Sequence, residues 1–190
     1  MQFNRLKIPD IVLIQPKVFV DERGFFLETY RQNEYANAGI TQPFVQENHS
    51  KSRQGVLRGL HYQIQQAQGK LVRVVLGEIF DVAVDLRRSS TTYGHWVGQP
   101  LSSANKYQMW IPPGFAHGFY VLSEWVEVIY KTTNYWAPEW ERTLLWNDPD
   151  INIQWPIPQE STLSACSPLL SPKDTEGVRL IDLPDEDIFE

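Results

Sequence analysis

The chain has 190 residues, of which 42% are hydrophobic and 21% charged, and its formal net charge at pH 7 is −6. This length predicts a single domain over residues 1–190 with one buried core, and the composition excludes overall disorder. No run of Lys and Arg is dense enough to follow a phosphate backbone, so a nucleic-acid partner is not expected.

Short runs rich in β-branched and aromatic residues recur through the first two thirds of the chain, bounded by Gly, Pro, Asn, Asp or Ser. This spacing predicts an all-β sandwich or barrel. The predicted strands cover residues 11–20, 24–30, 44–49, 56–63, 71–76, 79–86, 108–111, 118–122 and 126–132.

Helix is expected only over residues 33–38, with Asn33 as the cap and Gly39 as the stop. Gly77 and Glu78 stand between two β-branched runs and predict a hairpin turn. From about Pro156 the chain becomes rich in Pro, Ser and acidic residues, which predicts an extended tail that lies over the barrel or is partly disordered. The final acidic residues, 182–190, are predicted to be a solvated terminus.

Cysteine content and the length of apolar segments indicate the cellular compartment in which the protein is expected. The single cysteine, Cys166, cannot form an internal disulfide, and residues 1–14 lack the long apolar stretch of a signal peptide. No segment approaches the roughly eighteen consecutive apolar residues of a membrane-spanning helix. We therefore expect a soluble, cytoplasmic protein without a membrane partner.

The chain has four histidines, and His61 has the most suggestive surroundings because Arg58 and Gly59 precede it in a strand-like segment. An imidazole with a pKa of about 6.5 suits proton abstraction near neutral pH. Arg58 and His61 are three positions apart, so a regular strand would point them to opposite faces. Gly59 is the natural site for a bulge that turns both into one cavity. The alternative is a surface histidine without a role.

Two aspartates share one face of the run 79–86, because Asp81 and Asp85 alternate with Phe80, Val82, Val84 and Leu86. This alternation puts either the acidic or the apolar set inward, and in an ordinary barrel the apolar set would point inward. An inward Asp81 would need a cation such as Lys70 or Arg58 to offset its desolvation.

Two further side chains could carry chemistry. Residues 112–119 form a rigid turn that delivers His117 at the head of a strand. Tyr130 shares a face of its run with Val126 and Val128, and this face is expected to be buried. A buried phenol can donate a proton in a cavity, although by its burial alone Tyr130 is more typical of core than of a catalytic site.

Several ordered motifs occur together at consistent spacing. They cover residues 21–29, 46–50, 56–63, 68–73, 80–85, 113–119 and 130–133. Together they strongly resemble the dTDP-4-dehydrorhamnose 3,5-epimerase family, over about residues 3–155. The resemblance implies a cupin-like β-barrel (jelly roll) with short helices and an extended C-terminal segment, usually a homodimer. It also implies an isomerase that acts on dTDP-4-dehydro-6-deoxy-glucose in dTDP-rhamnose biosynthesis for lipopolysaccharide or cell-wall polysaccharide, without a metal or cofactor.

By this resemblance His61 would be the base, Tyr130 the acid on the opposite face of the sugar ring, and Lys70 the cation near the enolate oxygen. The residues that would contact the nucleotide, pyrophosphate or sugar are Arg23, Glu28, Gln46, Asn48, Arg58, Asp81, His117, Glu141 and Lys173. The chemistry explains these roles. A hydrogen beside a ketone is acidic because the negative charge moves to the carbonyl oxygen, so an epimerase needs a base and a cation. Inversion then needs an acid on the other face, and arginines suit a pyrophosphate.

Two departures from the family pattern concern the histidine's partner and an aromatic pair. The family orients its histidine with an aspartate in a Ser-x-Lys-Asp stretch, and of two candidate stretches, 163–167 and 170–174, only the second retains Lys-Asp. Asp174 is therefore the expected partner. Trp136 stands where relatives often carry a tyrosine, which keeps stacking but removes a hydroxyl.

Three alternatives remain open at this point. A metal-dependent cupin would use His-x-His, but Gln63 occupies the second histidine position, and His61 and His117 are too few for a confident site. A non-catalytic sugar-binding barrel would need neither an acid nor a base. The third is a mono-epimerase that inverts only the 3- or 5-carbon of another dTDP-4-keto-6-deoxy sugar.

Overall fold

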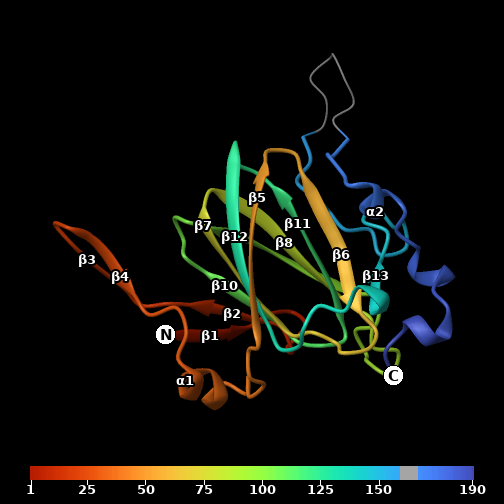
Figure 1. Cartoon of the computed structure of the whole chain (residues 1–190), viewed down its shortest axis with the longest axis horizontal. Helices are drawn as coiled ribbons and strands as arrows, with labels where there is room; N and C mark the ends of the chain where they lie inside the picture. The colour runs from red at the N-terminus through yellow and green to blue at the C-terminus, as the bar shows by residue number, and fades with distance from the viewer. Residues whose placement is uncertain (159–166) are drawn as a thin grey trace.

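The computed structural model describes residues 1–158 and 167–190, and within them strands far outweigh helices, as predicted. Two sheets face each other, in the orders β1-β2-β10-β7-β12-β5 and β13-β6-β11-β8-β9 (Figure 1). The first contains β1 (Gln2–Arg5), β2 (Val12–Gln15), β10 (Gln108–Ile111), β7 (Lys70–Leu76), β12 (Trp125–Thr132) and β5 (Gln46–Arg53). The second contains β13 (Glu141–Thr143), β6 (Leu57–Gln63), β11 (Phe115–Val121), β8 (Glu78–Asp85) and β9 (Trp96–Ser102).

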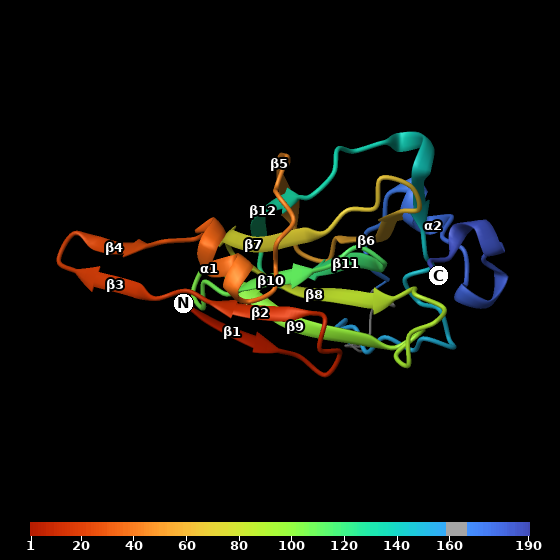
Figure 2. The same cartoon turned by 90° about the horizontal axis from the view of Figure 1, so that it is seen from below.

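A separate hairpin, β3 (Val18–Asp21) and β4 (Gly24–Leu27), projects from the body as an arm in both views (Figures 1 and 2). The prediction of one strand over 11–20 was therefore wrong, because the run is divided between β2 and β3. Pro16 lies at the break, where its missing N–H cannot join a ladder. The arm leaves its apolar side chains exposed, with Phe25 at 59% and Phe26 at 70%.

The main core lies between the two sheets, where β7 and β12 contribute Val72 and Val128 and β8 contributes Ile79 and Ala83. The opposite face of β8 is also covered, since Val82 and Val84 pack in a second cluster with C-terminal residues. The acidic face of β8 therefore points into the barrel, and the expectation of an inward apolar face is wrong. It failed because the chain's own end covers the apolar face and removes it from water.

The C-terminal residues hold this position by polar contacts as well as by burial of Leu183 and Ile188. Asp187 is 9% exposed and accepts a hydrogen bond of 2.7 Å from Arg142 Nε. The prediction of a solvated terminus is thus wrong for this residue. Among the described residues of the last third of the chain are the short 3₁₀ helices η1 (Pro138–Trp140), η2 (Leu180–Asp182) and η3 (Asp185–Asp187).

Gly77 does form a turn, with φ of +76°, but the predicted hairpin is wrong because the turn joins β7 of one sheet to β8 of the other. β8 pairs instead with β9, an edge strand that the sequence did not predict because Gly98 and Pro100 interrupt its apolar pattern.

Helix α1 (Gln32–Asn37) begins one residue earlier than predicted, so Asn33 lies inside the helix and is not its cap. Gly39 follows its end with φ of +90°, as a stop signal should. The other α-helix in the described part of the chain is the short α2 (Pro172–Thr175). Neither helix, nor any other among residues 1–158 and 167–190, is long and apolar enough to cross a membrane.

Candidate active site

A cavity of about 340 Å³ opens between the two sheets, and most of the predicted site residues line it. β5 and β12 supply one wall, β6 and β11 the other, and α2 and β13 reach its rim. The lining residues are Gln46, Asn48, Ser50, Arg58, His61, Gln68, Lys70, His117, Phe119, Tyr130, Trp136, Glu141 and Lys173.

His61 meets Asp174 directly behind this wall, with 2.5 Å between the imidazole Nε2 and the carboxylate Oδ1. Burial alone would raise the pKa of Asp174, but hydrogen bonds from His61, Ser171 and Gly59 outweigh it and lower the pKa to about 2. An ionised carboxylate can only accept, so Nε2 of His61 carries the proton and Nδ1 keeps the free lone pair. Burial, assisted by the nearby cations Lys173 and Lys70, lowers the pKa of His61, which favours the neutral form that a base requires.

Asp174 is fixed by its own short helix. Ser171 caps α2 in a capping box, and its hydroxyl donates to Asp174 Oδ2 at 2.7 Å. The other carboxylate oxygen also accepts from the backbone N–H of Gly59 at 3.2 Å. The residue predicted as the partner of His61 therefore lies at hydrogen-bond distance. The alternative stretch 163–167 lies, except for Ser167, outside the described residues.

The backbone at Gly59 is irregular, as predicted. Gly59 has φ of +128°, and the register between β6 and β11 shifts between His117 and Phe119. A Cβ at this position would lie 2.5 Å from Gly118 Cα, so only glycine allows the two strands to approach. The irregularity lets Arg58 and His61 line the same cavity.

Lys70 and Tyr130 supply a cation and a phenol to the same space. Lys70 is 9% exposed and donates to the carbonyl oxygen of His61 at 3.1 Å. Burial lowers the pKa of Lys70 to about 8, although Glu141 and Asp81 oppose the shift. Burial and then Glu141 raise the pKa of Tyr130, so the phenol keeps its proton at neutral pH.

Asp81 does not line the cavity but holds a residue that does. Its side chain is fully buried, and Oδ1 lies 2.7 Å from His117 Nε2. His117 is therefore the residue that contacts Asp81 directly and offsets its desolvation. Lys70 interacts with Asp81 only through the attraction of opposite charges. At the rim, Lys173 and Glu141 form an ion pair of 2.9 Å.

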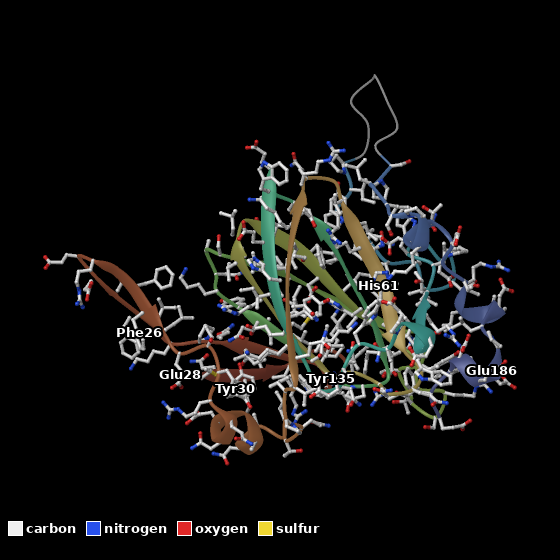
Figure 3. All side chains as sticks on the ribbon, viewed as in Figure 1. Phe26, Glu28, Tyr30, His61, Tyr135 and Glu186 are labelled. Atoms are coloured by element: carbon white, nitrogen blue, oxygen red, sulfur yellow. The ribbon has the colours of Figure 1, made fainter. Side chains whose placement is uncertain are left out.

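Two predicted site residues lie elsewhere. Arg23 and Glu28 belong to the region of the arm and pair locally, Arg23 with Asp21 and Glu28 with Arg31. Figure 3 shows Glu28 on the arm side of the molecule, well away from His61. Neither residue lines the cavity of its own chain.

The structure also adds lining residues that sequence reasoning missed, namely Ser50, Gln68 and Phe119. A period-2 count could have found Ser50, because it shares a strand face with Gln46 and Asn48.

The predicted metal alternative needs a cluster of ligands, and the described part of the chain contains no group of three or more His, Cys, Asp or Glu side chains that could hold an ion. Gln63 turns its amide toward the backbone of the nearby loop.

The family described as dTDP-4-dehydrorhamnose 3,5-epimerase matches residues 5–182 of this chain. A protein of that name from Pseudomonas aeruginosa is 59% identical over 183 residues, which are 96% of this chain and 97% of that protein. One from Shigella flexneri is 54% identical, over 96% of this chain and 97% of its own length.

Among solved structures, the dTDP-6-deoxy-D-glucose-3,5-epimerase of Legionella pneumophila Philadelphia 1, in complex with dTDP-4-keto-L-rhamnose, superimposes with a TM-score of 0.93. It is 48% identical and covers 99% of this chain and 97% of its own. A 3'-monoepimerase from Streptomyces bikiniensis, in complex with dTDP-quinovose, has a TM-score of 0.83 at 30% identity, over 93% of this chain and 86% of its own. These similarities confirm the cupin-like barrel.

Proposed function

The chain belongs to the dTDP-4-dehydrorhamnose 3,5-epimerase family and is a sugar-nucleotide epimerase, and from this premise we propose how its residues perform the reaction. It converts dTDP-4-dehydro-6-deoxy-glucose to dTDP-4-dehydro-rhamnose in dTDP-rhamnose biosynthesis. The observation that carries the mechanism is one cavity lined by a carboxylate-bound imidazole, a buried ammonium and a protonated phenol.

In the proposed mechanism, Nδ1 of His61 removes the hydrogen from a carbon beside the 4-ketone. The electron pair of the broken C–H bond moves onto the ketone oxygen, where the ammonium of Lys70 stabilises the negative charge. Tyr130 then delivers its phenolic proton to the opposite face of the same carbon. Solvent takes the proton from His61 and returns one to Tyr130, and the cycle repeats at the second carbon.

Substrate recognition is proposed for the polar residues around this centre. Arg58 and Lys173 carry the positive charge that suits a pyrophosphate, and Gln46 and Asn48 offer amides along β5. Asp81 orients His117 toward the sugar through its 2.7 Å contact. Glu141, paired with Lys173, completes the rim of the cavity.

Incubation with dTDP-4-dehydro-6-deoxy-glucose in heavy water, followed by NMR of the product, tests the function. Deuterium is expected at both the 3- and the 5-carbon, because each loses its hydrogen to His61 and regains one that has exchanged with solvent. Label at one carbon alone would identify a mono-epimerase, the activity named for the relative from Streptomyces bikiniensis. No label at either carbon would reject the reaction.

Tyr130→Phe is expected to separate proton removal from inversion. The variant keeps the ring but loses the hydroxyl, so His61 can still remove and return a proton on one face. We expect inverted product to form about 10²- to 10⁴-fold more slowly, while deuterium exchange into unreacted substrate is much less affected. The measurement follows both rates by NMR in heavy water. Equal losses in the two rates would contradict the assignment of Tyr130 as the acid.

We also propose a homodimer in which the arm of one subunit reaches the cavity of the other. The arm exposes Phe19, Val20, Phe25 and Phe26, at 51%, 77%, 59% and 70%, and an apolar hairpin of this kind is typical of an association surface. In this arrangement Arg23 and Glu28 would approach the partner's substrate. The single cysteine, Cys166, fits the proposed cytoplasmic setting, where the product would serve polysaccharide synthesis.

Mixing two inactive variants tests the arm. If arms act between subunits, a heterodimer of Arg23→Ala and His61→Asn chains contains one cavity with both native residues, and mixing should restore activity. If arms act within a subunit, no cavity regains both residues and the mixture stays inactive. Unfolding and refolding the two chains together allows exchange, and a mixture of each variant with itself is the control. A monomer by light scattering would reject the dimer.

A further inference from the structure

Residues 133–137 form the loop that carries Trp136 to the cavity. The buried side-chain amide of Gln63 bonds to the backbone of this loop. We propose that Gln63 is a positioning residue for substrate binding, which acts by fixing Trp136 in the wall of the cavity. The inference rests on the proposed function, since it concerns how tightly this cavity holds its nucleotide sugar.

The side chain of Gln63 contacts the loop on both sides of Trp136. It is 4% exposed, its Oε1 accepts from Ala137 N at 2.9 Å, and its Nε2 donates to Tyr135 O at 3.2 Å. The same Nε2 donates to Gln66 O at 3.0 Å. A primary amide offers one acceptor and two donors at once, and here all of them are used on backbone groups.

Trp136 needs this support because its ring has few other constraints. The residue is 58% exposed, and no ring-to-ring or cation contact to it is found in the described part of the chain. The backbone N–H of Trp136 donates to Gln46 Oε1 at 3.0 Å. The position of the ring is therefore set mainly through its backbone. A wall that is ordered before the substrate arrives does not consume binding free energy to become ordered.

Gln63 lies on β6 two residues beyond His61, yet its contacts leave the catalytic groups untouched. Its side-chain amide bonds to the backbone of Gln66, Tyr135 and Ala137, and none of these is a catalytic group. Its loss should therefore weaken binding without changing the chemical step. This separation distinguishes positioning of Trp136 from a general structural role.

The test is Gln63→Met, which keeps the length of the side chain but removes the amide. We expect KM for dTDP-4-dehydro-6-deoxy-glucose to rise about 5- to 50-fold, with kcat within about twofold of the native enzyme. Gln54→Met is the control, because Gln54 also donates to a backbone carbonyl, that of Leu122, away from the cavity. If Gln63→Met does not fold, Gln63→Asn, which is too short to reach both neighbours of Trp136, takes its place.

A double-mutant cycle with Trp136→Ala tests whether Gln63→Met changes KM through the ring of Trp136. If Gln63 acts through the ring, Gln63→Met should raise KM much less in the Trp136→Ala enzyme than in the native one. Equal increases in both backgrounds, an unchanged KM, or a fall in kcat as large as the rise in KM would overturn the inference. Failure of the native enzyme to turn over this substrate would instead reject the proposed function.

Discussion

His61→Asn is expected to abolish deuterium incorporation at both carbons beside the ketone, with kcat reduced by about 10²- to 10⁴-fold or more. Asparagine preserves a polar side chain of similar reach, but its amide cannot accept a proton near neutral pH. Exchange at both positions should be lost together because the proposed mechanism uses His61, which lines the cavity with Lys70 and Tyr130, as the base at each carbon. The measurement is NMR of substrate and product in heavy water, extended to long incubation.

His49→Asn is the matched control for this change. His49 also lies on a strand, but it is exposed and pairs at the surface with Glu127 at 3.3 Å. It should retain native turnover. Exchange that persists at one carbon in the His61→Asn enzyme would reveal a second base and reject the single-base mechanism.

The native pH profile should reflect the same groups. His61 must be neutral to act, so kcat/KM should rise as pH increases through its lowered pKa. Lys70 must be charged, so activity should fall as pH increases above about 8, where burial places its pKa. A profile without the alkaline fall would remove Lys70 from the role of the cation.

Asp174→Asn is expected to lower kcat by about 10²- to 10⁴-fold, through His61 rather than through the substrate. The carboxylate holds the Nε2–H tautomer at 2.5 Å and stabilises the imidazolium that forms when the base accepts a proton. An amide lacks the charge and can present its own N–H to the ring. KM should change little, since Asp174 does not line the cavity.

The direction of the pH shift identifies this role. The hydrogen bond and charge of Asp174 raise the pKa of His61, against the lowering by burial. Their removal should therefore move the acidic limb of the profile to lower pH while the maximum rate falls. Asp182→Asn is the control, because Asp182 makes an exposed ion pair with Arg179 at 2.7 Å. A native maximum rate, or a limb that moves to higher pH, would contradict the assignment.

Local pattern and motif spacing determined much of this protein from the sequence. Alternating apolar residues predicted most strands of the barrel, because the side chains of a strand alternate between its faces whatever lies beyond them. Gly59 predicted the irregular backbone that brings Arg58 and His61 to one cavity, since the two residues are three positions apart. The resemblance to a family with a Ser-x-Lys-Asp stretch implied Asp174 as the partner of His61, and the two residues lie at hydrogen-bond distance across a separation of 113 residues.

Tertiary structure alone decided features that depend on what covers a surface. The inward acidic face of β8 follows from the C-terminal residues that bury its apolar side, and strand periodicity cannot reveal such a cover. Arg23 and Glu28 lie outside the cavity of their own chain because β3 and β4 pair with each other and not with either sheet. The amide of Gln63 faces the loop around Trp136, which only three-dimensional proximity of residues 63 and 135–137 could show. Sequence pattern reports local geometry, whereas burial and partnership are set by contacts between distant segments.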